Sequence, residues 1–246
     1  MRNRLPFRKP QLVVLLAITA SALCLAQSAN PMYRVTVTHV KPDMLDEWRD
    51  LQRNEVIPAL KKAGVKSQTV YRTYFGDPYE FVTVVPFDKY ADFDNPAPIT
   101  KVLEAAAGAR LQARTRKCII STNSYVNTRF ADLSNIPDTP PEVLVVSRYR
   151  ITQGKMQDFQ NLVKSDVLPL YVKAKAYGIV SQRGFGANPN DVTMTSGYAK
   201  MADLDLGPIM TRQLGAEAAA KVNAKFQGIR TPVDRMVRRR VADLSF

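Results

Sequence analysis

The feature that most constrains the fold of this 246-residue chain is an internal repeat. Residues 111 positions apart are identical or chemically alike over long stretches, and the clearest pair of segments is RFADLS from Arg129 and RVADLS from Arg240. The same spacing carries the alanine-rich stretch 103–114 onto 214–225, and Trp48 onto Phe159. Similarity at one fixed spacing indicates repeated structural units. We therefore expect two similar units in tandem.

Each copy predicts the same order of elements. A β-branched and aromatic stretch is followed by an apolar stripe with helical spacing, then by two further strands separated by turn residues. An alanine-rich helix and a last strand complete the copy, and the order βαββαβ is that of a ferredoxin-like unit in an α+β fold. Pro58 and Pro169 fall late in the first helix of each copy, where an interior proline costs about 3 kcal/mol, so we expect a break or kink there. The first three strands of each copy are expected at 33–40, 65–75 and 80–86, and at 143–151, 179–185 and 191–198.

The first 26 residues differ in composition from the rest. Four basic residues within positions 2–9 precede an apolar run from Leu12 to Ala26, and small polar residues follow. This order is typical of a secretory signal peptide. The run is shorter than the ~20 apolar residues of a spanning helix, so we expect cleavage near Ala26, with an uncleaved membrane anchor as the alternative. The mature protein is expected to be exported, either periplasmic or secreted.

The repeat and the N-terminal segment together predict the division of the chain. Between the copies lies a segment with three prolines in seven positions, which is linker composition. The expected parts are a signal peptide (1–26), a first ferredoxin-like repeat (31–134), a proline-rich linker (135–141) and a second ferredoxin-like repeat (142–246).

The charge of the chain favours anionic partners. Removing residues 1–26, which hold four basic and no acidic residues, lowers the formal net charge from +13 to +9. A basic surface suits acidic metabolites, membrane surfaces or nucleic acid. For an exported protein we expect a small anionic or aromatic molecule and no nucleic acid, with membrane contact only through an uncleaved signal segment.

The opening of each copy resembles a known family. Val35–Leu45, which leads into Trp48, is similar to the start of NIPSNAP-type domains, and these resemble the antibiotic-biosynthesis monooxygenase superfamily of dimeric α/β barrels. The second copy repeats the pattern over 146–159. In that superfamily two units pair through their sheets around a cavity. The resemblance therefore implies that one chain with two copies closes a barrel internally, as a pseudo-dimer.

Several kinds of catalytic site are excluded by the residues themselves. The chain has no phosphate loop, no nucleophile elbow and no paired-histidine metal motif. His39 is the single histidine, so a Ser-His-Asp triad and a multi-histidine metal site are both nearly excluded. We expect no metal and no cofactor. Some relatives bind haem through an axial histidine on a helix, whereas His39 lies on a predicted strand.

Arginines distinguish the second copy from the first. Arg148 and Arg150 replace Val37 and His39 on one face of the equivalent strand. In a ferredoxin-like sheet the last strand lies beside the first, and here the last strand is rich in arginine. Converging guanidiniums would bind a carboxylate, sulfate or phosphate, and the alternative is a solvated basic edge that prevents strand aggregation. The candidate ligand-binding residues are His39, Arg148, Tyr149, Arg150, Arg238 and Arg240.

These observations leave three hypotheses for function. The preferred one is an exported tandem α/β-barrel protein that binds a small anionic or aromatic ligand in its barrel. The second is a cofactor-independent monooxygenase of the antibiotic-biosynthesis type, in which strand tyrosines orient a phenolic substrate. The third is a protein-interaction module. Whether the chain is an enzyme stays open at this point.

Overall fold

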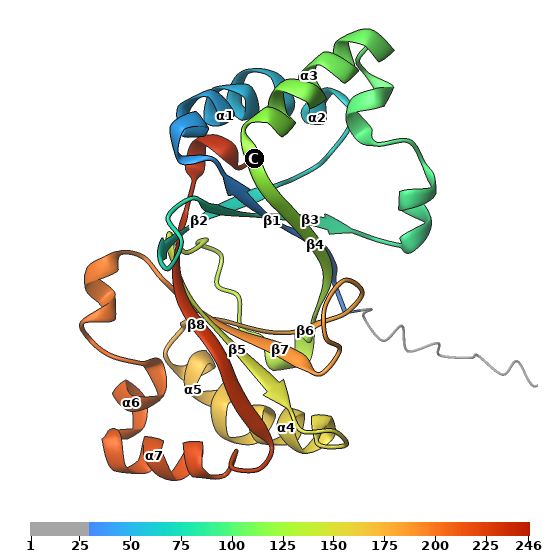
Figure 1. Cartoon of the computed structure of the whole chain (residues 1–246). Coiled ribbons are helices and arrows are strands. Elements are labelled where there is room, and N and C mark those ends of the chain that lie inside the picture. The colour runs from blue at the N-terminus through green and yellow to red at the C-terminus, as the bar shows by residue number, and fades with distance from the viewer. Residues whose placement is uncertain (1–29) are drawn as a thin grey trace, which may run out of the picture.

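A computed structural model describes residues 30–246, and its centre is a closed β-barrel (Figure 1). The expected signal peptide, residues 1–26, lies outside the described residues. All neighbouring strands are antiparallel. The strands are β1 (Met32–Val40), β2 (Thr69–Phe75), β3 (Glu80–Phe87), β4 (Ile119–Arg129), β5 (Val143–Ile151), β6 (Tyr177–Arg183), β7 (Asp191–Tyr198) and β8 (Arg230–Arg240).

The barrel runs in the order β1-β3-β2-β8-β5-β7-β6-β4 before it closes on β1. The first four strands are therefore neighbours in the order β4-β1-β3-β2, and the last four follow the same order, β8-β5-β7-β6. The two sets meet where β2 pairs with β8 and where β4 pairs with β6. We call these contacts the β2/β8 junction and the β4/β6 junction. The expectation of an α+β chain that closes a barrel is confirmed.

The helices cover the outside of the barrel in two layers, one over the first four strands and one over the last four (Figure 1). They are α1 (Leu45–Leu51), α2 (Ile57–Lys62), α3 (Ala105–Lys117), α4 (Met156–Leu162), α5 (Leu168–Lys173), α6 (Ile209–Leu214) and α7 (Ala216–Ala224). Short 3-10 helices span Pro42–Met44, Tyr90–Asp94, Pro98–Lys101, Ala131–Leu133, Met201–Leu204 and Ala242–Leu244. No helix within residues 30–246 is both long and apolar enough to cross a membrane.

The two helix prolines lie next to unusual helical turns. Pro58 is in the first turn of α2, directly after a π-helical segment at Gln52–Val56, and Pro169 is in the first turn of α5 after a π-helical segment at Val163–Val167. Proline has no N–H group and its ring clashes with the carbonyl four residues earlier, so a wider turn accommodates it. The expected break is therefore a local change of helix type.

Strand alternation divides each strand between two environments. One face packs against the helices and forms two hydrophobic cores. The ring centroids of Trp48 and Phe81 lie 4.5 Å apart in one core, and those of Phe159 and Phe226 lie 5.9 Å apart in the other. Cys118 is also buried in the first of these cores. The other face of every strand points into the barrel. Any site inside the barrel is therefore built from alternate strand residues.

Candidate functional site

A cavity of about 410 Å³ lies inside the barrel and is lined by alternate residues of all eight strands. This volume is within the range of pockets that hold one small organic molecule. Aliphatic side chains form part of the wall, including Val35, Val82 and Leu144. Four tyrosines and four arginines supply most of its hydrogen-bonding groups.

The proline-rich segment between β4 and β5 lines one end of the cavity through Pro137, Asp138 and Pro141. The backbone of Asn135 exchanges two hydrogen bonds of 2.8 Å with Gly178 on β6, which fixes the start of this segment. Gly197 lies so close to its end that an added Cβ would meet Pro141 at 2.7 Å. The segment at 135–141 is thus held against the barrel as part of the cavity wall.

The four cavity arginines lie at the two junctions. Arg238 and Arg240 belong to β8, where Arg240 is opposite Tyr71 of β2. Arg129 of β4 and Arg183 of β6 lie at the other junction, where β4 residue 127 is opposite Arg183. The Nε atoms of all four arginines are buried and have no hydrogen-bond partner among the described residues.

Only one junction provides carboxylates for its arginines. Nη2 of Arg238 lies 3.1 Å from Oε1 of Glu80, and Nη1 of Arg240 lies 3.5 Å from Oε1 of Glu142. Within residues 30–246, no ion pair of 4 Å or less joins Arg129 or Arg183 to a carboxylate. The β4/β6 junction therefore presents positive charge that the described residues leave without a direct counterion.

Arg183 is the arginine of the β4/β6 junction whose pKa is lowered by burial. Burial lowers its pKa below the ordinary value of an arginine, and the positive charges of Arg148 and Arg238 add to the effect, while the negative charge of Asp234 opposes it. Its guanidinium lies 4.3 Å from the ring centroid of Tyr125, a cation–π contact that offsets part of the cost of burial. Asn127, directly opposite on β4, donates a 2.9 Å hydrogen bond to Ser181 while its own Oδ1 is buried without a partner.

The cavity tyrosines are Tyr33, Tyr71, Tyr125 and Tyr177. Burial raises the pKa of Tyr71, although the nearby positive charge of Arg240 opposes this. Burial also raises the pKa of Tyr177. Both phenols are therefore neutral near pH 7, and each can donate a hydrogen bond to a bound molecule.

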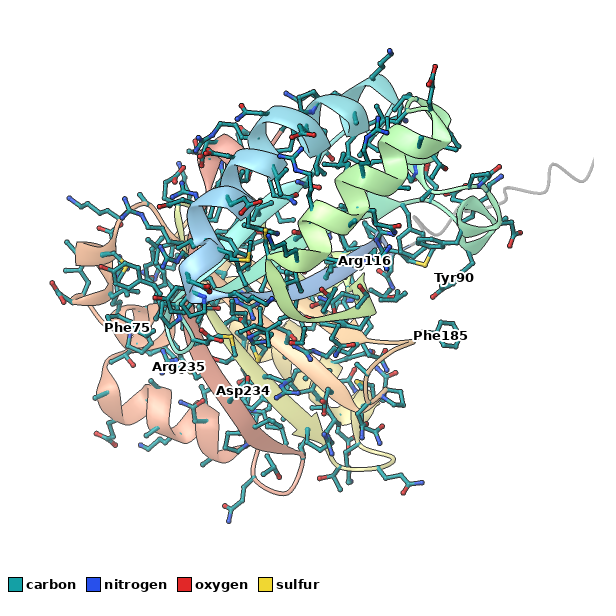
Figure 2. The ribbon with its side chains drawn as sticks, turned by 45° about the horizontal axis from the view of Figure 1, so that its top comes forward. Phe75, Tyr90, Arg116, Phe185, Asp234 and Arg235 are labelled. Atoms are coloured by element: carbon teal, nitrogen blue, oxygen red, sulfur yellow. The ribbon has the colours of Figure 1, made fainter. Side chains whose placement is uncertain are left out.

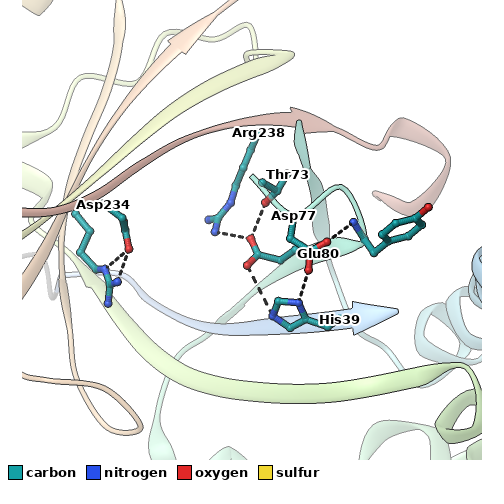
Figure 3. A network of polar contacts seen from close by, with 8 residues as sticks. His39, Thr73, Asp77, Glu80, Asp234 and Arg238 are labelled. Carbon is teal, nitrogen blue, oxygen red and sulfur yellow. Dashed lines mark hydrogen bonds and ion pairs between the residues drawn. The ribbon is translucent and has the colours of Figure 1, made fainter. Parts of the chain in front are cut away.

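A second polar region of the barrel interior surrounds His39 (Figure 3). Nδ1 of His39 lies 2.8 Å from Oδ2 of Asp77, and its Nε2 lies 3.9 Å from Oε2 of Glu80. Oε1 of Glu80 also accepts hydrogen bonds from Thr73 at 2.5 Å and from Arg238 at 3.1 Å. His39 does not line the cavity, but Glu80 connects it to Arg238, which does.

The arginines that distinguish the second copy are also held by carboxylates. Arg148 contacts Asp234 through Nε at 2.9 Å and Asp191 through Nη1 at 3.5 Å, and Arg150 pairs with the other oxygen of Asp191. Asp191 is only 2% exposed. β5 does lie beside β8, as expected, yet Arg148 and Arg150 converge on these carboxylates and do not line the cavity. Tyr149 faces the helix layer, where the guanidinium of Arg230 lies 4.2 Å from its ring.

Of the residues singled out in the sequence, the structure thus brings Arg238 and Arg240 to the cavity. Arg129 was within reach of sequence reasoning, because it precedes Arg240 by the repeat spacing of 111 residues. Arg183 was not, since its place depends on the register of β6 against β4. The sequence pattern contains no signal for that pairing.

The described residues do not fit a histidine-ligated haem or a polynuclear metal site. The single histidine lies outside the cavity with both ring nitrogens directed at carboxylates. In the part of the chain that the structure describes, no three His, Cys, Asp or Glu side chains are grouped as metal ligands.

Comparison with known proteins identifies the fold. No family model matches the chain, and no curated protein matches it. Solved structures do: a "putative monooxygenase" from Fusobacterium nucleatum has a TM-score of 0.58 at 14% identity, covering 87% of this chain and 93% of that one. A "putative monooxygenase" from Lactobacillus acidophilus has a TM-score of 0.57 at 10% identity, covering 88% and 95%. An anthrone oxidase-like protein has a TM-score of 0.54 at 12% identity, covering 87% and 92%. The chain therefore shares the α/β-barrel fold of these proteins.

Proposed function

We propose that this chain is an exported binding protein made of two tandem ferredoxin-like units, which holds one small anionic or aromatic molecule in its barrel. The observation that carries the proposal is the set of four cavity arginines with buried, unpartnered Nε atoms. A buried donor without a hydrogen bond costs about 1–3 kcal/mol. A bound anion would satisfy several of these donors together.

The repeated strand order supports the tandem part of the proposal. Each set of four strands has the antiparallel order of a ferredoxin-like sheet, and a segment with three prolines connects the two sets. The basic and apolar composition of residues 1–26 supports export.

Native mass spectrometry of the protein purified from the exported fraction tests the binding function. We expect a mass above that of the polypeptide, which disappears on denaturation and belongs to one small molecule per chain. A protein that carries no molecule, and that binds no aromatic or anionic compound in calorimetry, would contradict the proposal.

A second candidate is a cofactor-independent monooxygenase. Neutral tyrosines beside unneutralised arginines could stabilise the phenolate of an aromatic substrate, and two of the similar structures are described as monooxygenases. The reaction would convert an aromatic CH₂ group to C=O, with one oxygen atom of O₂ in the product and the other in water. The substrate itself supplies the electrons.

Anthrone is a suitable probe for this activity, because an anthrone oxidase-like protein shares the fold. An enzyme would raise oxygen uptake in an oxygen electrode far above the protein-free rate. Oxygen uptake at the protein-free rate, combined with tight binding of anthrone, would reject the monooxygenase and retain the binding function.

A further inference from the structure

The arginines of the β4/β6 junction point to the chemical class of the ligand, an inference that rests on the proposed binding function. We infer that the ligand is an aromatic carboxylate whose carboxylate group lies between Arg129 and Arg183. The β2/β8 junction also has two arginines, but Glu80 and Glu142 pair with them. The anionic group is therefore expected to bind at the β4/β6 side of the cavity.

The register of the β4/β6 junction makes the two arginines neighbours on the cavity face. Arg129 is opposite Ser181, and Arg183 is opposite Asn127, so the arginines are diagonal neighbours on the face that lines the cavity. Diagonal partners of this kind are about 7–8 Å apart at their Cα atoms, which is within the reach of long side chains. The guanidinium of Arg183 lies over the ring of Tyr125, on the side of Asn127 away from Arg129. On binding, the two long side chains would turn toward each other and donate to both oxygens of one carboxylate.

The charges along the cavity wall favour a monoanion. Among the four cavity arginines, Arg238 and Arg240 pair with Glu80 and Glu142, whereas Arg129 and Arg183 have no carboxylate partner within residues 30–246. Asp138, on the proline-rich segment, adds one negative charge to the same wall. The wall therefore has one more positive charge than negative, which matches a carboxylate better than a phosphate dianion.

The rest of the cavity favours an aromatic body. Tyr33 and Tyr71 line the wall together with Val35, Val84 and Leu144, so a flat apolar molecule would contact rings and aliphatic side chains. Simple anions such as acetate would satisfy the arginines but leave this surface unfilled. Affinity is therefore expected to need both the ring and the carboxylate.

Calorimetry on the purified protein with 2-naphthoate tests this assignment. We expect 2-naphthoate to bind at least tenfold more tightly than the neutral 2-naphthamide, 2-naphthyl phosphate or acetate. A charged hydrogen bond is worth about 1.5–3 kcal/mol, and about 1.4 kcal/mol corresponds to that tenfold difference. Because all four compounds are compared on the unchanged protein, the result does not depend on the folding of any variant.

Variants then locate the anion. Arg183→Gln and Arg129→Gln should each weaken 2-naphthoate binding at least tenfold and weaken 2-naphthamide binding far less, because the amide carries no charge. Arg183→Met, which keeps the apolar stem, should weaken 2-naphthoate binding to a similar extent. Arg230→Gln is the matched control, because Arg230 is half-buried like Arg183, has a pKa lowered by burial and stacks 4.2 Å from a tyrosine ring, yet lies outside the cavity. It should leave 2-naphthoate binding unchanged.

The possible outcomes separate this inference from the function on which it rests. Equal binding of 2-naphthoate and 2-naphthamide, unaffected by either arginine variant, would overturn the carboxylate assignment while the barrel remains a binding site. Tighter binding of 2-naphthyl phosphate than of 2-naphthoate would overturn the inference that the ligand is a monoanion. Binding of none of the compounds, by a protein that also carries no molecule when purified, would overturn the proposed function itself.

Discussion

The two junctions of the barrel join the same two sets of strands but differ in charge. Each joins the first four strands to the last four by antiparallel pairing, and each places two arginines on the cavity face. At the β2/β8 junction carboxylates hold the arginines, whereas at the β4/β6 junction no carboxylate of residues 30–246 lies within 4 Å of Arg129 or Arg183. Barrel closure therefore does not require charge neutralisation at both junctions.

The β4/β6 junction is reinforced by the turn that follows β6. The backbone N–H of Val126 donates to the carbonyl of Phe185 at 2.9 Å, and that of Gly184 donates to the carbonyl of Val126 at 2.8 Å. The ring of Phe185 also lies 5.5 Å from that of Tyr90, which follows β3 (Figure 2). Backbone and aromatic contacts thus stabilise the junction whose arginines lack carboxylates.

The largest expected effect comes from disrupting this turn. Gly186 has a φ of +84°, and a Cβ added to it would lie 2.4 Å from the carbonyl oxygen of Ser124 on β4. Gly186→Ala should therefore lower the free energy of unfolding by about 3 kcal/mol, because a backbone atom must move. Gly154→Ala is the control, since Gly154 has a φ of +79° but no atom within 4 Å, and it should cost only about 1 kcal/mol. Equal losses in urea unfolding would mean that the turn does not support the junction.

The next largest effect concerns the neutralised junction. Glu80→Gln removes the carboxylate that pairs with Arg238, which is 7% exposed, and should lower the free energy of unfolding by about 2 kcal/mol. Glu217→Gln breaks an exposed ion pair with Lys221 and should change it by less than about 0.5 kcal/mol.

The same substitution should make the β2/β8 junction resemble the other one. In an Arg183→Gln background, Glu80→Gln frees the guanidinium of Arg238 toward the cavity, and we expect it to restore part of the 2-naphthoate affinity measured by calorimetry. Unchanged affinity in the double variant would show that the two junctions differ in more than their carboxylates.

A smaller effect of opposite sign is expected for Arg183. Replacing a half-buried charge that forms no ion pair by an apolar side chain of similar size removes a desolvation cost, so Arg183→Met should raise the free energy of unfolding of the ligand-free protein by about 1 kcal/mol. Arg148→Met should lower it, because Asp234 and Asp191 would lose a partner. A loss of stability in Arg183→Met would indicate that the cation–π contact with Tyr125 outweighs the cost of burial.

These contrasts also define what the sequence could predict. The repeat spacing and the strand and helix patterns predicted the α+β order of elements, whereas the closed barrel was expected from the resemblance to a barrel-forming superfamily. Arg238 and Arg240 reach the cavity because alternation on β8 fixes their face. The carboxylate partners of Arg148 lie on neighbouring strands, and the position of Arg183 depends on β6 pairing with β4. Such relations between strands arise only on folding.

The smallest expected effect is a pH dependence confined to one junction. The pKa of Asp77 is below its ordinary 3.8, because it accepts a hydrogen bond from the backbone N–H of Tyr79 and because His39 is close. A carboxyl whose pKa is lowered by folding stabilises the fold above its ordinary pKa, and this contribution is lost as the pH falls through the lowered value. Asp77 contacts His39, which lies beside Glu80, the partner of Arg238. Acid should therefore destabilise the β2/β8 junction first. The arginines of the β4/β6 junction have no paired carboxylate that could be protonated. Hydrogen-exchange protection factors should therefore fall from about pH 4 toward pH 2 for Thr73 and Arg238 more than for Asn127 and Ser181. Asp77→Asn should reduce that difference. An equal fall at both junctions would remove the electrostatic distinction between them.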